Sequence, residues 1–105
     1  MPAEVSVDDL ATAIEAGAWV LDVREPDEFE AGHVPAAHHV PLATVADNLA
    51  LIPTNEVVYC VCKAGGRSMK AATMLEERGY QVVSVAGGTD GWAASGRDLS
   101  FEASL

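Results

Sequence analysis

The 105-residue sequence predicts an α/β fold, with a small central parallel β-sheet of four or five strands flanked by helices on both faces. Two observations predict this class. Short, nearly unbroken apolar runs, typical of buried parallel strands, alternate along the chain with segments that carry helix-start and helix-stop residues. Half of the residues are apolar, and the length suits one hydrophobic core, so we expect a single domain over residues 1–105.

A capped helix and a strand open the chain. Ser6 can cap a helix over residues 7 to about 16, because its hydroxyl can accept a hydrogen bond from an N–H of the first turn. Gly17 is suited to end that helix. Residues 19–23, apolar except for Asp22, then predict a short strand.

The middle of the chain predicts two helices around a second strand. Pro26 suits the start of a short helix and Gly32 suits its end. Residues 38–41 are predicted to form a short strand, and residues 42 to about 51 a helix.

The remaining chain continues the alternation. It predicts a strand at 57–61, a helix at 68–78 that Gly79 stops, and a strand at 81–85. In a parallel sheet, ligands bind beyond the carboxyl ends of the strands. That edge is expected to bring together four residues: Asp22, Arg24, Cys62 and Gly87.

Composition narrows the function. The formal net charge of −10 argues against nucleic acid or an anionic membrane surface as a partner, because both require clustered cations. No apolar stretch is long enough to span a membrane, and the N-terminus lacks the features of a signal peptide, so we expect a cytoplasmic protein. The two cysteines, separated by one residue, suit a reducing compartment and indicate reactivity more than cross-linking.

The most informative segment is a glycine-rich loop between the predicted strand at 57–61 and the helix that follows it. Its residues are Cys62, Lys63, Ala64, Gly65, Gly66, Arg67 and Ser68. A loop at that position can point several N–H groups inward, and the positive end of the next helix favours an anion or a thiolate there. Cys62 is therefore the candidate nucleophile, with its thiolate favoured by the N–H groups and by the charges of Lys63 and Arg67.

Other residues of the loop have simpler expected roles. Gly65 and Gly66 allow the backbone to turn inward, in places with positive φ. Ser68 is predicted to be the N-cap of the following helix. We expect no metal, because zinc sites usually space paired cysteines by two to four residues, whereas Cys60 and Cys62 are separated by one and the sequence has no second pair. We also expect no cofactor.

The motif Cys-x-x-Gly-x-Arg-Ser at residues 62–68 resembles the active-site loop of the rhodanese domain, a sulfurtransferase. Two further motifs resemble the signatures of that family in the family's order. They are Leu21-Asp22-Val23-Arg24-Glu25 with Glu28-Phe29, residues 32–37 and 40–42 near the N-terminus, and residues 85–92 near the C-terminus. The resemblance extends over about residues 4–97, which would be the core of a rhodanese-like domain.

The resemblance implies a double-displacement reaction. Cys62 would take the outer sulfur of thiosulfate or a related donor as a persulfide, and a thiophilic acceptor such as cyanide or a thiol would remove it. Lys63 and Arg67 would hold the anionic end of the donor. The implied partners are thus a small anionic sulfur donor and a thiol or cyanide acceptor, a protein acceptor included.

Several residues keep a structural alternative. Arg67 could instead brace the loop through Asp22 or Glu25. Asp22 and Arg24 resemble the Asp-x-Arg pair of the family, and a buried ion pair is the favoured interpretation for Asp22. Cys60 is expected to behave as a small buried hydrophobe. The alternative is a resolving cysteine that closes a disulfide with Cys62 under oxidation, which the backbone geometry of a strand opposes. His33 and Trp92 are expected to be core residues.

The same loop is compatible with two other functions. A cysteine-dependent phosphatase or arsenate reductase places five residues between cysteine and arginine, whereas four lie between Cys62 and Arg67 here, and the smaller ring suits a single sulfur atom. A non-catalytic rhodanese-like interaction module would be expected to lack the cysteine or the arginine, and this chain has both.

Overall fold

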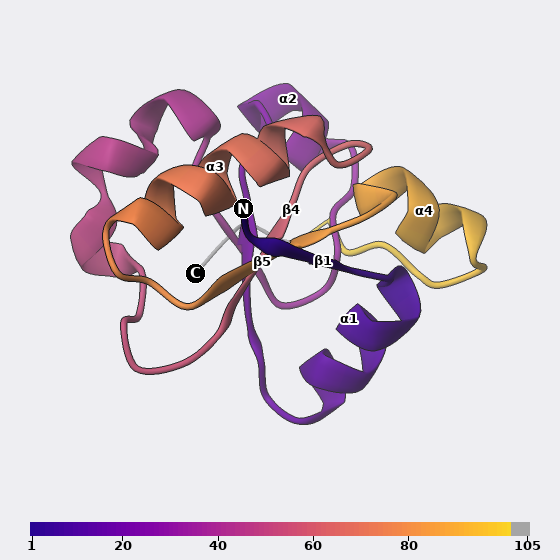
Figure 1. Cartoon of the computed structure of the whole chain (residues 1–105). Coiled ribbons are helices and arrows are strands. Elements are labelled where there is room, and N and C mark those ends of the chain that lie inside the picture. The colour runs from indigo at the N-terminus through magenta and orange to yellow at the C-terminus, as the bar shows by residue number, and fades with distance from the viewer. Residues whose placement is uncertain (102–105) are drawn as a thin grey trace.

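The computed structural model describes residues 1–101 and contains one five-stranded sheet with helices on both faces (Figure 1). The strands are β1 (Ala3–Val5), β2 (Trp19–Asp22), β3 (Ala37–His39), β4 (Val58–Val61) and β5 (Val82–Val85). They lie in the order β1-β5-β4-β2-β3, and every neighbouring pair is parallel. The α/β class with a central parallel sheet is therefore confirmed.

The helices form two layers. They are α1 (Val7–Glu15), α2 (Pro26–Glu30), α3 (Gly66–Glu77) and α4 (Gly88–Ala94), with the 3-10 helices η1 (Leu42–Asp47) and η2 (Leu49–Leu51). Helices α1 and α4 cover one face of the sheet, and α3 with η1 covers the other (Figure 1). Within residues 1–101, no helix combines the length and the apolar character that crossing a bilayer requires.

The first helix begins as the sequence predicts. The Ser6 hydroxyl accepts a hydrogen bond from the Asp9 N–H at 3.0 Å, and the Asp9 carboxylate accepts one from the Ser6 N–H at 3.2 Å. This reciprocal capping satisfies two of the N–H groups that the start of a helix leaves without intrahelical partners.

Two expectations about elements were wrong or incomplete. The single helix predicted over residues 42–51 is replaced by η1 and η2, which join at Asn48. Asn48 leaves the helical conformation with φ −124° and ψ 24°, and its amide donates to the Thr44 carbonyl; Asn, Thr and Val are weak helix formers. Strand β1, which pairs with β5 at the sheet edge, was not identified, since three residues are too short to show a pattern.

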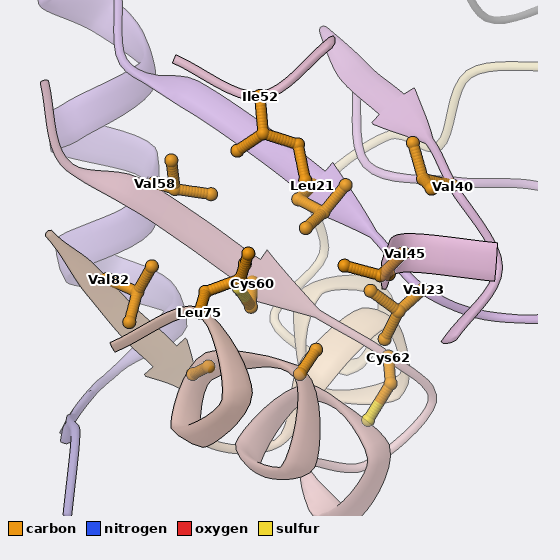
Figure 2. Close-up of a cluster of buried hydrophobic side chains, with 12 residues drawn as sticks. Leu21, Val23, Val40, Val45, Ile52, Val58, Cys60, Cys62, Leu75 and Val82 are labelled. Atoms are coloured by element: carbon orange, nitrogen blue, oxygen red, sulfur yellow. The ribbon is translucent and has the colours of Figure 1, made fainter. Parts of the chain in front are cut away.

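The alternation of side chains along the strands divides the core into two clusters. The cluster under α3 and η1 includes Leu21, Cys60, Cys62 and Leu75, and Figure 2 shows its side chains together. The other cluster includes Val20 and Val61, which are the neighbours of Leu21, Cys60 and Cys62 in the sequence and point to the opposite face.

The loops that follow β4 and β5 are bound to each other. The N–H groups of Gly87, Thr89 and Asp90 donate to the carbonyls of Ala64, Cys62 and Lys63, at 3.2, 2.8 and 3.0 Å respectively. Gly88 lies between these contacts with φ +54°, and a Cβ atom there would lie 2.4 Å from the Cys62 carbonyl oxygen. Only glycine therefore fits where the two loops meet.

We expect Gly88→Ala to lower the free energy of unfolding by about 3 kcal/mol or more, because it adds a backbone clash to the cost of a positive φ. Gly17→Ala is the matched control: its φ is +89°, but no atom lies within 4 Å of the added Cβ. That control should lose only about 1–2 kcal/mol. Urea unfolding of both variants measures the difference, and equal losses would contradict the role of the close contact.

Candidate active site

Cys62 directly follows β4, and its side chain is only 1% exposed. It lies on the sheet face that α3 covers, close to the first turn of that helix (Figure 2). The strand fixes the position of the cysteine, and the next residues of the chain curve around its sulfur before the helix begins. The sulfur therefore lies within the curve of the loop, beside Gly65 and Ser68.

Polar groups of the loop surround the sulfur. The Gly65 N–H donates to Sγ of Cys62 at 3.0 Å, and the Ser68 hydroxyl oxygen lies 3.4 Å from it. Burial by itself raises the pKa of Cys62, but the Ser68 hydroxyl and the N–H groups of Ser68, Gly65 and Ala64 outweigh it, so the pKa lies below its usual value. The surroundings thus favour the nucleophilic thiolate.

The start of α3 differs from the expectation. Gly65 is the N-cap, with φ +127°, and the helix begins at Gly66, so the prediction that Ser68 is the N-cap was wrong. Ser68 lies inside the first turn and is buried, and its hydroxyl contacts the Gly65 carbonyl at 3.1 Å as well as Sγ of Cys62. A glycine able to adopt positive φ comes three residues before Ser68 and ends the loop earlier.

Gly66 differs from Gly65 in its backbone conformation. Its φ lies outside the left-handed region, and no atom lies within 4 Å of the position that a Cβ would occupy. Gly65 therefore has the positive φ that the sequence predicts in places along this loop, and Gly66 does not.

Arg67 braces the loop, but through a carboxylate that had not been expected. Its guanidinium donates to both oxygens of Glu28 on α2, at 2.6 and 2.9 Å, and not to Asp22 or Glu25. The hydrogen bond from Arg67 lowers the pKa of Glu28 to about 2, and the same pair raises the pKa of Arg67. Glu28 also accepts from the Glu25 N–H at 3.0 Å, which fixes the carboxylate at the start of α2.

Lys63 lies at the surface of the loop. Its side chain is 63% exposed and pairs with Asp90 at 2.8 Å, and this hydrogen bond raises the pKa of Lys63. Exposed pairs of this kind contribute little to stability and exchange easily with other ions. Lys63 can therefore leave Asp90 for an incoming anion more readily than Arg67 can leave Glu28.

Asp22 and Arg24 form the buried ion pair that the sequence favoured. The Arg24 guanidinium donates to both Asp22 carboxylate oxygens at 2.9–3.1 Å, and also to the Gly32 carbonyl at 2.9 Å. Asp22 is the register partner of Val61, the residue before Cys62. The pair therefore fixes the end of β2 beside the loop without reaching the sulfur through any described hydrogen bond.

Thr89, on α4, had not been singled out. Its N–H donates to the Cys62 carbonyl at 2.8 Å, and its side-chain hydroxyl is buried without a hydrogen-bond partner among residues 1–101. An unsatisfied buried hydroxyl is costly, and such groups tend to occur where a ligand or reactive group completes the hydrogen bonding. The sequence signal was its position in the motif at residues 85–92.

The remaining candidates are core residues. Burial raises the pKa of the Cys60 thiol to about 12, so this group behaves as a small hydrophobe. His33 is buried and its Nδ1 lies 2.8 Å from the Phe29 carbonyl oxygen, and Trp92 packs in the core beside α1. Among the described residues, no group of three or more His, Cys, Asp or Glu is placed to hold a metal ion.

Known proteins are similar to this chain in sequence. The chain is 38% identical over 80 residues to the thiosulfate sulfurtransferase GlpE of Pseudomonas putida, covering 75% of this chain and 73% of that protein. It is 31% identical over 91 residues to YtwF of Bacillus subtilis, covering 85% and 88%. It spans only 40% of the length of another Bacillus subtilis relative, YrkF.

A solved structure agrees at the level of the whole fold. The rhodanese-related protein from Thermoplasma volcanium superposes with a TM-score of 0.89 at 28% identity, covering 95% of this chain and 99% of that one. The chain also matches 18% of the length of the Bacillus anthracis protein CoADR-RHD, with a TM-score of 0.86 at 32% identity. The family model described as rhodanese-like domain matches residues 6–95. The chain therefore belongs to the rhodanese-like domain family.

Proposed function

We propose that this domain transfers sulfane sulfur from thiosulfate or a related donor to a thiophilic acceptor, and that Cys62 carries the sulfur between them. The observation that carries the proposal is the buried Cys62 sulfur, which faces the N–H groups of Ala64, Gly65 and Ser68 and has a lowered pKa. Such hydrogen-bond donors stabilise the negative charge of a thiolate without a separate general base.

The reaction has two steps. In the first, the Cys62 thiolate attacks the outer sulfur of thiosulfate, and the bond between the two sulfurs of the donor breaks. Sulfite leaves with the bonding electron pair, and the cysteine becomes a persulfide. In the second step, cyanide or a thiolate attacks the outer sulfur of the persulfide, and the Cys62 thiolate is released as the leaving group. No external oxidant or reductant is required.

The shape of the loop supports a sulfur donor more than a phosphate ester. Cys62 is 1% exposed, so the reacting atom of the donor has to protrude far enough to enter the loop. The terminal sulfur of thiosulfate or of a persulfide does so, whereas a phosphorus atom is surrounded by its own oxygens. The loop length, with four residues between Cys62 and Arg67, supports the same conclusion.

The two cations of the loop have separate roles in this proposal. Lys63, exposed and weakly paired, would meet the anionic end of the donor, while Arg67 holds the loop against α2 through Glu28. We infer a reducing compartment, the cytoplasm, because Cys62 has to return to a free thiolate after each cycle. A protein thiol is included among the acceptors.

Incubation of the wild-type protein with thiosulfate should add the mass of one sulfur atom, and Cys62→Ser should abolish both this addition and thiosulfate:cyanide sulfurtransferase activity. Cys60→Ser is the matched control and should retain sulfur loading, because Cys60 is a buried group whose pKa is raised to about 12. Intact-mass spectrometry and thiocyanate release measure the two outcomes. Full activity in Cys62→Ser, or phosphate-ester turnover without sulfur loading, would refute the proposal.

Glu28→Gln should destabilise the fold in a pH-dependent way. A lowered folded-state pKa means that ionised Glu28 stabilises the fold above its usual pKa of 4.5, and that this contribution disappears as the pH falls towards about 2. We expect the variant to be less stable by about 1–2 kcal/mol at pH 7, allowing for partial exposure, and nearly equal to wild type near pH 2. Urea unfolding across this range tests it, with Asp90→Asn as the exposed-pair control. A constant difference would contradict the ion-pair explanation.

Thr89→Val should separate stability from activity. The substitution removes a buried hydroxyl that has no described partner, so the free energy of unfolding should stay equal or rise by about 1 kcal/mol. If the hydroxyl donates to the outer sulfur of the persulfide, the rate of sulfur transfer should nevertheless fall about tenfold. Thermal unfolding and thiocyanate release measure the pair of effects. A stable variant with unchanged activity would exclude this role for Thr89.

A further inference from the structure

Ser84 is a buried polar residue with no role in the two-step reaction described above. It lies on β5, is 0% exposed, and is the register partner of Cys60 on β4. Its side chain is on the sheet face covered by α3, in the same layer as Cys60 and Val82. A hydroxyl in such apolar surroundings is costly unless it forms a hydrogen bond.

The described contacts give the Ser84 hydroxyl one hydrogen-bond partner. Its oxygen lies 2.8 Å from the Ser68 hydroxyl oxygen, and either group can be the donor. Ser68 in turn lies 3.4 Å from Sγ of Cys62 and 3.1 Å from the Gly65 carbonyl oxygen. The three side chains therefore form a chain of contacts from β5, through α3, to the candidate nucleophile.

The number of hydroxyl protons limits which of these three contacts can be hydrogen bonds at the same time. Ser68 has one hydroxyl proton and three acceptors within reach, namely the sulfur, the Gly65 carbonyl and Ser84. If Ser68 donates to Ser84, its proton cannot reach the sulfur. If Ser84 donates to Ser68, the Ser68 proton remains available, and the donation also polarises the Ser68 hydroxyl.

The two ionisation states of Cys62 require different arrangements. The thiol can donate its own proton to the Ser68 oxygen, which then needs no donation from Ser84. The thiolate has lost that proton and can only accept, so Ser68 has to donate to the sulfur, and its oxygen is free to accept from Ser84. Both hydroxyls can rotate without moving the backbone, so the change needs no rearrangement of the fold.

We propose that Ser84 is a positioning residue that donates to Ser68 when Cys62 is ionised and so directs the Ser68 hydroxyl to the thiolate. Its part in sulfur transfer rests on the function proposed above. Its effect on the thiolate can be measured without any sulfur donor.

Among the described contacts, the Ser84 hydroxyl forms no hydrogen bond with any charged or titratable group around the loop. These groups are Cys60 on β4, Arg67 on α3 with Glu28 on α2, the Asp22–Arg24 pair at the end of β2, and the Lys63–Asp90 pair between the two loops. A shift in the titration of Cys62 after Ser84→Ala would therefore report the lost hydroxyl.

The test is the pH dependence of alkylation of Cys62 by iodoacetamide. In Ser84→Ala the rate below the midpoint should fall about three- to tenfold, while the limiting rate at high pH should stay within about twofold of wild type. Cys60→Ala, which removes a buried neighbour on the adjacent strand but no hydroxyl, is the matched control and should leave the profile unchanged. An unchanged profile in Ser84→Ala would overturn the proposal.

A double-mutant cycle tests whether Ser84 acts through Ser68. Ser68→Ala should shift the midpoint further than Ser84→Ala, and adding Ser84→Ala to Ser68→Ala should produce no further shift. An equal effect of Ser84→Ala in both backgrounds would refute the relay. Thermal unfolding of each variant gives its stability at the pH of the assay.

A measurement on the wild-type protein keeps the test valid even if a variant fails to fold. With ¹³C-labelled serine, the Cβ resonance of Ser84 should change with pH at the midpoint of alkylation, and a resonance constant across that range would overturn the proposal. Thiosulfate loading of the wild type is assayed separately. Failure to load with the Ser84 effect intact rejects only the proposed function, whereas loading with no Ser84 effect rejects only the relay.

Discussion

The site depends on hydrogen bonds between two loops, in which the N–H groups of residues 87, 89 and 90 donate to the carbonyls of residues 64, 62 and 63 respectively. The N–H and C=O of a peptide unit point in opposite directions, so carbonyls held toward α4 leave N–H groups free to face the other side. The sulfur of Cys62 lies on that side. Gly88 permits the close approach, and the fold therefore orients the loop before any donor arrives.

The electrostatics of the site follow from this arrangement. The sequence has six Lys and Arg residues, and the two within the loop both pair with carboxylates, Arg67 with Glu28 and Lys63 with Asp90. The full charges near the sulfur are thus compensated, and the thiolate is favoured chiefly by hydrogen bonds from the backbone and from Ser68. A site built from dipoles at short range is less sensitive to salt than one built from exposed charges.

The sequence predicted the parts of the site that depend on local pattern. Apolar runs located β2, β4 and β5, and the placement of Cys62 between a strand and a helix predicted the loop. The partner of Arg67 could not be predicted, since Asp22, Glu25 and Glu28 all precede it by about forty residues and only the orientation of α2 decides which carboxylate reaches it. Ser84 carries no local signal either, because a serine in a buried strand gains meaning only from the helix packed above it.

The backbone and the side chains of the loop have different roles. Its backbone faces the sulfur, while the Lys63 side chain is exposed and a Cβ at Gly66 would meet open space. Substitutions at Lys63 and Gly66 can therefore alter which molecules bind at the surface of the loop, while the groups that stabilise the thiolate stay in place. A domain built in this way can change its sulfur donor or acceptor by mutation while the surroundings of its nucleophile stay the same.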